Sequence, residues 1–210
     1  MKLKICGMKY PDNILEVSQL LPNYMGFIFW KKSSRFFDGE IPNLPKSIQK
    51  VGVFVNAPLD EIVSKIEKYD LNLVQLHGNE SVAFCLDLKH EIKNLKQTPI
   101  EIIKVFSILD DFDFSILKEY EAICDYFLFD TKGKLPGGNG TVFDWKVLEK
   151  YPSTKPFFLS GGIGIEEIAP VKQLLKTNLP IHAIDINSKF EIEPGLKNIQ
   201  LLKDFKIHIK

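Results

Sequence analysis

The sequence predicts an α/β fold, a single-domain (β/α)8 barrel of the TIM type, and three observations lead to this prediction. Eight short apolar runs recur along the chain at a step of about 25 residues, enough for one strand, one helix and two short connections. The segments between these runs often show helical periodicity. The length of 210 residues, with 45% hydrophobic content, lies close to the lower size limit of this barrel and gives one domain over residues 1–210.

The apolar runs are the predicted strands. The sixth run, YFLFD, is almost wholly apolar, which is typical of a strand that is covered on both faces. A doubly wound open sheet is the competing architecture, but it usually has fewer strands, and no GxGxxG fingerprint follows the first run. The eight predicted strands are Leu3–Cys6, Met25–Phe29, Val51–Val55, Leu73–Leu76, Ile102–Phe106, Tyr126–Asp130, Phe157–Ser160 and Ala183–Ile186.

Helices are predicted where apolar residues share one helical face. Asp144 is the expected N-cap of a helix after the sixth strand, and Pro194 and Gly195 mark the start of the last one. The apolar faces are Ile14, Val17 and Leu21; Ile62, Val63, Ile66 and Tyr69; Trp145, Val147 and Leu148; Ile168, Val171, Leu174 and Leu175; and Leu196, Ile199, Leu202 and Phe205.

The composition excludes several classes of function. The 27 basic and 27 acidic residues cancel, so overall charge gives no argument for a nucleic-acid partner or an anionic membrane. Three cysteines without metal-ligand spacing indicate neither a disulfide framework nor a zinc site. No apolar run is long enough for a signal peptide or a membrane span, so a cytoplasmic protein is expected.

A barrel builds its active site from the carboxyl ends of its strands and the loops that follow them. Cys6 closes the first predicted strand, and Lys4 shares its strand face, so a nearby cation would lower the thiol pKa from about 8.5 and favour a thiolate base. The alternative is that Cys6 is a small buried hydrophobic residue.

Asp130 closes the sixth strand, where a buried carboxyl group that holds its proton suits a general acid. The alternatives are that Asp130 only caps a turn or pairs with a lysine. Together, Cys6 and Asp130 indicate isomerisation through an enol or enolamine.

Two neighbouring loops suggest a phosphate site. Gly161 and Gly162 follow the seventh strand, and Asp185, Asn187 and Ser188 follow or end the eighth, where many barrels hold phosphate by backbone N–H groups. The predicted partner is therefore a small phosphorylated substrate. Lys189 and Lys197 of this region are able to assist phosphate binding, but solvated surface lysines are the favoured interpretation.

Further substrate contacts are predicted at four positions. Arg35, in the loop after the second strand, is able to hold a carboxylate of an aromatic substrate, although such charge runs are usually solvated. His77 is either a substrate contact or a satisfied core polar group, and Asn56 is open to the same two interpretations. Gly137 and Gly138 lie in the glycine-rich loop after Asp130, which is expected to close over the substrate.

Six fragments in barrel order resemble the phosphoribosylanthranilate isomerase family. They are KICGM at 4–8, SSRFF at 33–37, VGVFVN at 51–56, VQLHG at 74–78, FDTKGKLPGGNGTVFDW at 129–145 and LSGGI at 159–163. The resemblance implies an Amadori rearrangement of N-(5-phosphoribosyl)anthranilate in tryptophan synthesis, without metal or organic cofactor. It assigns Cys6 as general base, Asp130 as general acid and Arg35 to the anthranilate carboxylate. The sequence departs from the family at Lys189, which stands where glycine is common, and a left-handed conformation there would cost a lysine more.

Other interpretations remain open. A dual-specificity sugar-phosphate isomerase of tryptophan and histidine synthesis would use paired aspartates and a half-chain repeat, neither of which is visible. The α subunit of tryptophan synthase would need a glutamate–aspartate pair and a larger chain. A catalytically silent phosphate-binding barrel is the non-enzymatic alternative. The chain pattern is compatible with a monomer or a homodimer.

Overall fold

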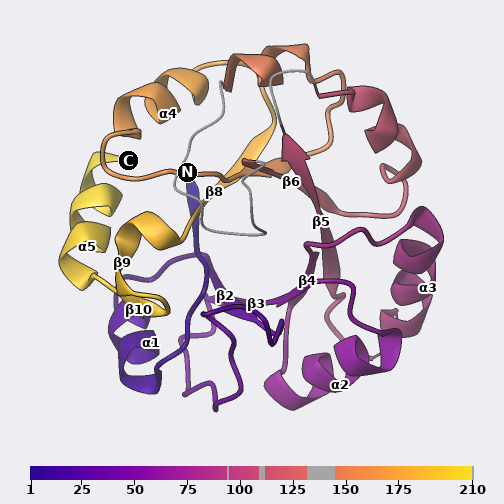
Figure 1. Cartoon of the computed structure of the whole chain (residues 1–210), viewed down its shortest axis with the longest axis horizontal. Helices are drawn as coiled ribbons and strands as arrows, with labels where there is room; N and C mark the ends of the chain where they lie inside the picture. The colour runs from indigo at the N-terminus through magenta and orange to yellow at the C-terminus, as the bar shows by residue number, and fades with distance from the viewer. Residues whose placement is uncertain (94, 109–111, 132–144, 210) are drawn as a thin grey trace.

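The computed structural model describes residues 1–93, 95–108, 112–131 and 145–209, and it contains the predicted closed barrel. Eight parallel strands follow one another around the ring in chain order, and β1 closes it by pairing with β8 through Lys4 and Asp185. The strands lie at the centre of Figure 1 with the helices around them. Their bounds are β1 Lys2–Ile5, β2 Tyr24–Ile28, β3 Gln49–Phe54, β4 Leu73–Leu76, β5 Glu101–Ile108, β6 Tyr126–Thr131, β7 Phe157–Leu159 and β8 Ile181–Ile186.

The helical layer is less regular than the ring of strands. Its α-helices are α1 Pro11–Ser18, α2 Leu59–Tyr69, α3 Val82–Ile92, α4 Ile168–Leu174 and α5 Ile199–His208. Three 3-10 helices lie in the described part of the chain, η1 Phe114–Glu119, η2 Trp145–Lys150 and η3 Ser188–Phe190. The expected N-cap Asp144 lies outside the described residues.

The expectation of a helix in every unit is wrong for the connection between β2 and β3. Residues 29–48 contain turns and an isolated bridge but no helix. Pro42 and Pro45 lie in this segment, and each removes a backbone donor that an interior helical turn needs.

The segment after β8, which was predicted to open the last helix at Pro194 and Gly195, also differs from the prediction. Instead of opening the last helix, Leu196 pairs in a small antiparallel hairpin of β9 Glu191–Glu193 and β10 Leu196–Lys197. Helix α5 begins later, and its N-cap Asn198 accepts a hydrogen bond from the Leu201 N–H. The hairpin thereby returns the chain towards the mouth of the barrel before α5 starts.

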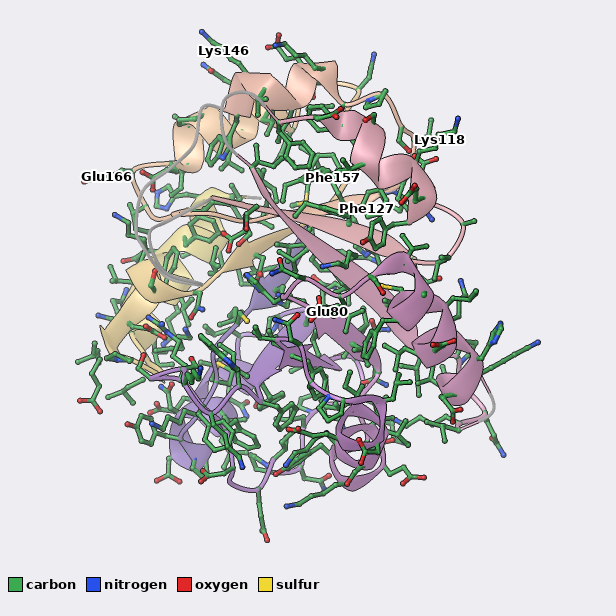
Figure 2. All side chains as sticks on the ribbon, turned by 45° about the vertical axis from the view of Figure 1, so that its right-hand side comes forward. Glu80, Lys118, Phe127, Lys146, Phe157 and Glu166 are labelled. Atoms are coloured by element: carbon green, nitrogen blue, oxygen red, sulfur yellow. The ribbon has the colours of Figure 1, made fainter. Side chains whose placement is uncertain are left out.

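Apolar side chains form two layers on opposite faces of the sheet. Phe127 and Phe157, neighbours on β6 and β7, belong to the large outer cluster that packs under the helices (Figure 2). The smaller cluster fills the barrel interior with Tyr24, Val51, Leu73, Ile103, Val105, Leu128, Phe158 and Ala183. Because side chains alternate along a strand, these inward positions determine which later residues face the mouth.

No described helix combines the length and the apolar character that crossing a bilayer requires. The cytoplasmic location and the monomeric or dimeric state stay predictions.

Candidate functional site

Polar side chains replace apolar ones at the carboxyl ends of the strands. Leu128 faces the interior, so Asp130, two residues later on β6, faces the mouth. The same alternation from Leu73 directs Gln75 and His77 inward, and from Ala183 it directs Asp185 inward. The structure thus brings predicted site residues from distant parts of the chain to one end of the barrel.

A buried ion pair lies beside Cys6. Lys4 Nζ donates to Asp185 Oδ2 at 2.8 Å, and neither side chain is more than 6% exposed. Lys4 also acts on the Cys6 thiol, since its positive charge opposes the rise of the thiol pKa. The approach of Lys4 to Cys6 follows from their shared strand face. Residues Lys2–Ile5 of β1 pair with β8, which places Asp185 beside Lys4.

The expected direction of the Cys6 pKa is wrong. Burial raises the pKa of the Cys6 thiol, and the ammonium groups of Lys4 and Lys197 offset this only in part. Burial likewise raises the pKa of Asp185 against the opposing effect of Lys4. The site therefore holds a neutral thiol at neutral pH, and a thiolate there would be a stronger base than an exposed one.

Two glycines make room for these groups. A Cβ at Gly26, on the adjacent strand, would lie 2.7 Å from Cys6 Sγ. Gly7 has a φ of +74°, and a Cβ there would lie 2.6 Å from Asn187 Oδ1 and 2.8 Å from Arg35 Cδ. Gly26 of β2 and the segments that follow β2 and β8 therefore converge closely on the segment that carries Cys6.

Asp130 contacts two side chains from other strands. His77 Nε2 lies 3.4 Å from Asp130 Oδ2, and Ser160 Oγ donates to Oδ1 at 3.4 Å. On its other side, His77 Nδ1 accepts from Gln75 Nε2 at 3.0 Å, which leaves the ring proton on the nitrogen that faces Asp130. His77 is therefore not isolated in the core but lies at the mouth with Asp130.

The loop that carries His77 is fixed by a second buried pair. Glu80, labelled in Figure 2, accepts hydrogen bonds from the N–H groups of Asn56 and Gly78. Lys104 Nζ donates to Glu80 Oε2 at 3.1 Å and to the Gly78 carbonyl at 2.8 Å. Asn56 adopts a φ of +50° and accepts from the Asn79 N–H at 2.7 Å, a contact within this loop region.

Arg35 is bound by a carboxylate of its own chain. Its Nε and Nη2 donate to both oxygens of Glu191 at 2.7–3.0 Å. Glu191 also accepts from Lys197 Nζ at 2.7 Å. The interpretation of Lys197 as a solvated lysine is wrong, because its side chain is fully buried.

The two predicted phosphate loops are neighbours because β7 pairs with β8. Gly161 and Gly162 have φ values of +93° and +68°, which only glycine adopts readily. Lys189 lies in the short 3-10 helix η3 Ser188–Phe190 and is not among the described residues with positive φ, so its replacement of a glycine needs no left-handed backbone. Lys189 is exposed, as expected, and its stem packs on Gly164.

Several residues of this site were missed by the sequence reasoning. Gln75 was detectable because it lies two residues before His77 on the same inward strand face. Ser160 was detectable because it directly precedes Gly161, a predicted site residue. Glu191 and Lys197 gave no local signal, since their place depends on the hairpin that follows β8. The predicted contacts Gly137 and Gly138 lie outside the described residues.

The structure holds no group of three or more His, Cys, Asp or Glu side chains arranged for a metal ion within its described ranges. Buried polar atoms without a hydrogen-bond partner there include Asp185 Oδ1 and Gln75 Oε1. Both belong to inward-facing residues near the mouth.

Comparisons with known proteins agree on one family. The family model described as N-(5'-phosphoribosyl)anthranilate (PRA) isomerase matches residues 3–206. A relative from Parabacteroides distasonis, named N-(5'-phosphoribosyl)anthranilate isomerase, is 42% identical, with 98% of this chain and 91% of the relative covered.

Solved structures share the fold of this chain. The phosphoribosyl anthranilate isomerase of Thermus thermophilus superposes with a TM-score of 0.83 at 23% identity, covering 100% of this chain and 98% of the other. A phosphoribosyl anthranilate isomerase in complex with reduced 1-(o-carboxyphenylamino)-1-deoxyribulose 5-phosphate superposes with a TM-score of 0.80 at 25% identity, with the same coverage.

Proposed function

The chain belongs to the N-(5'-phosphoribosyl)anthranilate isomerase family, and we propose that Cys6 is its general base and Asp130 its general acid. The proposed reaction is the Amadori rearrangement of N-(5-phosphoribosyl)anthranilate to 1-(2-carboxyphenylamino)-1-deoxyribulose 5-phosphate in tryptophan synthesis. The observation that carries this assignment is the placement of a thiol and a carboxyl group at the ends of β1 and β6, both on the inner face of one barrel.

The reaction requires one proton donor and one proton acceptor. Protonated Asp130 gives its proton to the furanose ring oxygen, and the C1–O bond opens as the aryl nitrogen lone pair forms a Schiff base. The Cys6 thiolate then removes the proton from C2, whose electrons move into the iminium to give an enolamine. Tautomerisation gives the ketone, so atoms and electrons balance without an external oxidant or reductant.

The Schiff base supplies an electrostatic reason why a buried thiol can act as base. The cationic iminium next to Cys6 stabilises the thiolate, as the Lys4 ammonium group does. Both charges oppose the rise in the thiol pKa that burial causes. Asp185 balances the charge of Lys4 within the barrel. The positive charge that develops when the ring opens therefore makes the base available at the step that needs it.

The two ends of the substrate are assigned to separate groups. Arg35 is proposed to bind the anthranilate carboxylate, and the backbone N–H groups around Gly161, Gly162, Asn187 and Ser188 to bind the phosphate. Asp185 is kept in this set through its main chain only, because its carboxylate points inward to Lys4 and would repel a phosphate. The analogue held by the solved relative carries the same two ends, an aryl carboxylate and a 5-phosphate.

His77 is proposed to contact the substrate beside Asp130, which it faces at 3.4 Å. Gly137 and Gly138 are proposed to contact the substrate from the loop after β6. No metal or organic cofactor is required, because the aryl amine of the substrate acts as electron sink.

The test is turnover of freshly prepared phosphoribosylanthranilate by the purified protein, followed as loss of anthranilate-type fluorescence without added metal. Conversion is expected. A well-folded protein without turnover would instead support a silent phosphate-binding barrel. Equal turnover of the aminoimidazole substrate of histidine synthesis would support the dual-specificity enzyme.

A further inference from the structure

The guanidinium of Arg35 has one occupied edge and one open edge. Glu191 takes the hydrogen on Nε and one hydrogen on Nη2. Both hydrogens on Nη1 and the second on Nη2 remain without a partner in the described part of the chain, and a planar guanidinium binds a second carboxylate through that edge. The bond to Glu191 therefore occupies only part of the Arg35 guanidinium, and it determines which edge can bind a second carboxylate.

Glu191 is itself held in place. Its Oε1 accepts from Lys197 Nζ at 2.7 Å and from the Gly195 N–H at 3.1 Å, and its side chain is 4% exposed. Burial acts to raise the pKa of Glu191, but hydrogen bonds from Arg35 and Lys197 outweigh it, and the pKa lies below its usual range. Glu191 is thus a fixed anion.

Lys197 links this pair to the predicted phosphate loop. Its Nζ donates to Asn187 Oδ1 at 2.7 Å as well as to Glu191. The backbone of Lys197 is fixed by Asn13 of α1, which accepts from its N–H at 2.7 Å and donates to its carbonyl at 3.0 Å. One buried ammonium group therefore contacts residues that serve both proposed ends of the substrate.

The charges of this cluster leave room for an anion. Two basic side chains, Arg35 and Lys197, surround one carboxylate. Burial lowers the pKa of Lys197 and Glu191 opposes this, so a formal positive charge remains while Lys197 is protonated. With Glu191 alone, Arg35 would belong to a neutral pair and attract a substrate carboxylate less strongly. The cluster also lies next to the proposed base, because Arg35 Cδ approaches Gly7, the residue after Cys6.

We propose that Glu191 and Lys197 are positioning residues, which fix Arg35 so that its Nη1–Nη2 edge receives the aryl carboxylate of the substrate. This inference rests on the proposed function. It assigns roles to two residues that do not touch the reacting atoms, and it attributes preference for an anthranilate-derived substrate to the whole cluster.

The experiment compares two substrates that differ only in the carboxylate. Phosphoribosylanthranilate and the phosphoribosyl derivative of aniline are each given to the wild type and to Glu191→Gln. Loss of a charge-assisted contact should lower kcat/KM for the anthranilate substrate by about 10-fold to 100-fold, mainly through KM. The value for the aniline substrate should change by less than about threefold. Glu193→Gln, on the same hairpin but exposed, is the matched control and should affect neither substrate.

A second comparison tests whether Glu191 acts through Arg35. In an Arg35→Ala background, Glu191→Gln should cause no further loss for the anthranilate substrate, because residues that act as a unit are not additive. If Glu191→Gln leaves Lys197 unpaired and the protein fails to fold, the shorter but still charged Glu191→Asp variant takes its place, with the same expected selectivity.

Three results would overturn the inference. They are equal losses for both substrates, an undiminished loss in the Arg35→Ala background, and tighter binding of phosphoribosylanthranilate by Glu191→Gln, which would show that Glu191 competes with the substrate. Absence of wild-type turnover would contradict the proposed function instead, so the two failures are distinguishable.

Discussion

Lys4 Nζ and Asp185 Oδ2 lie 2.8 Å apart inside the barrel, in a pair that is closed to solvent and adjacent to the Cys6 thiol. Each charge in such a position is stabilised by the other, because an unpaired buried ion has a large desolvation cost. The pair also sets the electrostatic surroundings of the proposed base. Stability and catalysis are therefore linked at this position.

Lys4→Met should destabilise the protein strongly, since it leaves Asp185 as an uncompensated buried carboxylate. Breaking a buried pair from one side typically costs about 3–5 kcal/mol. Chemical denaturation measures the free energy of unfolding. The Lys4→Met/Asp185→Leu variant should recover most of that loss, and a double variant as unstable as Lys4→Met would show that the pair is not the cause.

The pH profile should report the raised pKa of Cys6. Since only the thiolate removes a proton, kcat/KM of an Asp130→Asn variant, in which the acid no longer titrates, should continue to rise above pH of about 8.5, the ordinary pKa of a thiol. Rate measurements from pH 6 to about 10 on this variant check the expectation, because in the wild type the loss of the Asp130 proton with rising pH offsets the gain in thiolate. A profile that levels off at or below pH of about 8.5 would mean that the thiol of the free enzyme has an ordinary or lowered pKa.

Gly26→Ala should impair catalysis through the position of Cys6. Its new Cβ would lie 2.7 Å from Sγ, so the thiol must shift, and kcat should fall by about 10-fold or more with a smaller change in KM. Gly39→Ala is the matched control, because its Cβ would meet nothing nearer than a ring carbon at 3.7 Å. Similar kinetics for the two variants would contradict the close fit around Cys6.

His182 should make the protein sensitive to acid at the opposite end of the barrel. Burial, with a contribution from Lys2, lowers its pKa to about 4. A lowered pKa stabilises the fold fully above the unfolded value of about 6.5 and loses that stabilisation as the pH falls towards 4.

Between these pH values, His182→Gln should lose about 1–2 kcal/mol less stability than the wild type, a figure reduced for the partial exposure of the ring. Urea denaturation at pH 7, 5.5 and 4.5 measures the difference. His90→Gln, at an exposed position of α3, is the control and should follow the wild type. Parallel curves for all three proteins would exclude His182 as the sensitive group.

The ring of strands was predictable because each strand is a short apolar run, and eight such runs at even spacing fit few folds. The inward direction of Asp130 and His77 followed from alternation once their strands were known. The helix expected between β2 and β3 was wrong, since spacing alone does not distinguish a helix from an irregular segment of similar length.

The electrostatics of the site were less predictable. The sequence shows that Lys4 shares a face with Cys6, but the balance between burial and charge that decides the thiol pKa depends on the packed interior. In the sequence alone, Lys197 cannot be distinguished from a surface lysine. Its contacts with Glu191 and Asn187 form only because the β9–β10 hairpin folds back towards them. Contacts made by such a return of the chain have no local pattern.

The most direct test of the proposed acid and base is steady-state turnover of phosphoribosylanthranilate by Cys6→Ser and Asp130→Asn. Each substitution keeps the approximate size of the side chain while it removes the proton-transfer group. Both variants should lose about two or more orders of magnitude in kcat, with smaller changes in KM. Wild-type turnover by either folded variant would contradict the assignment of that residue.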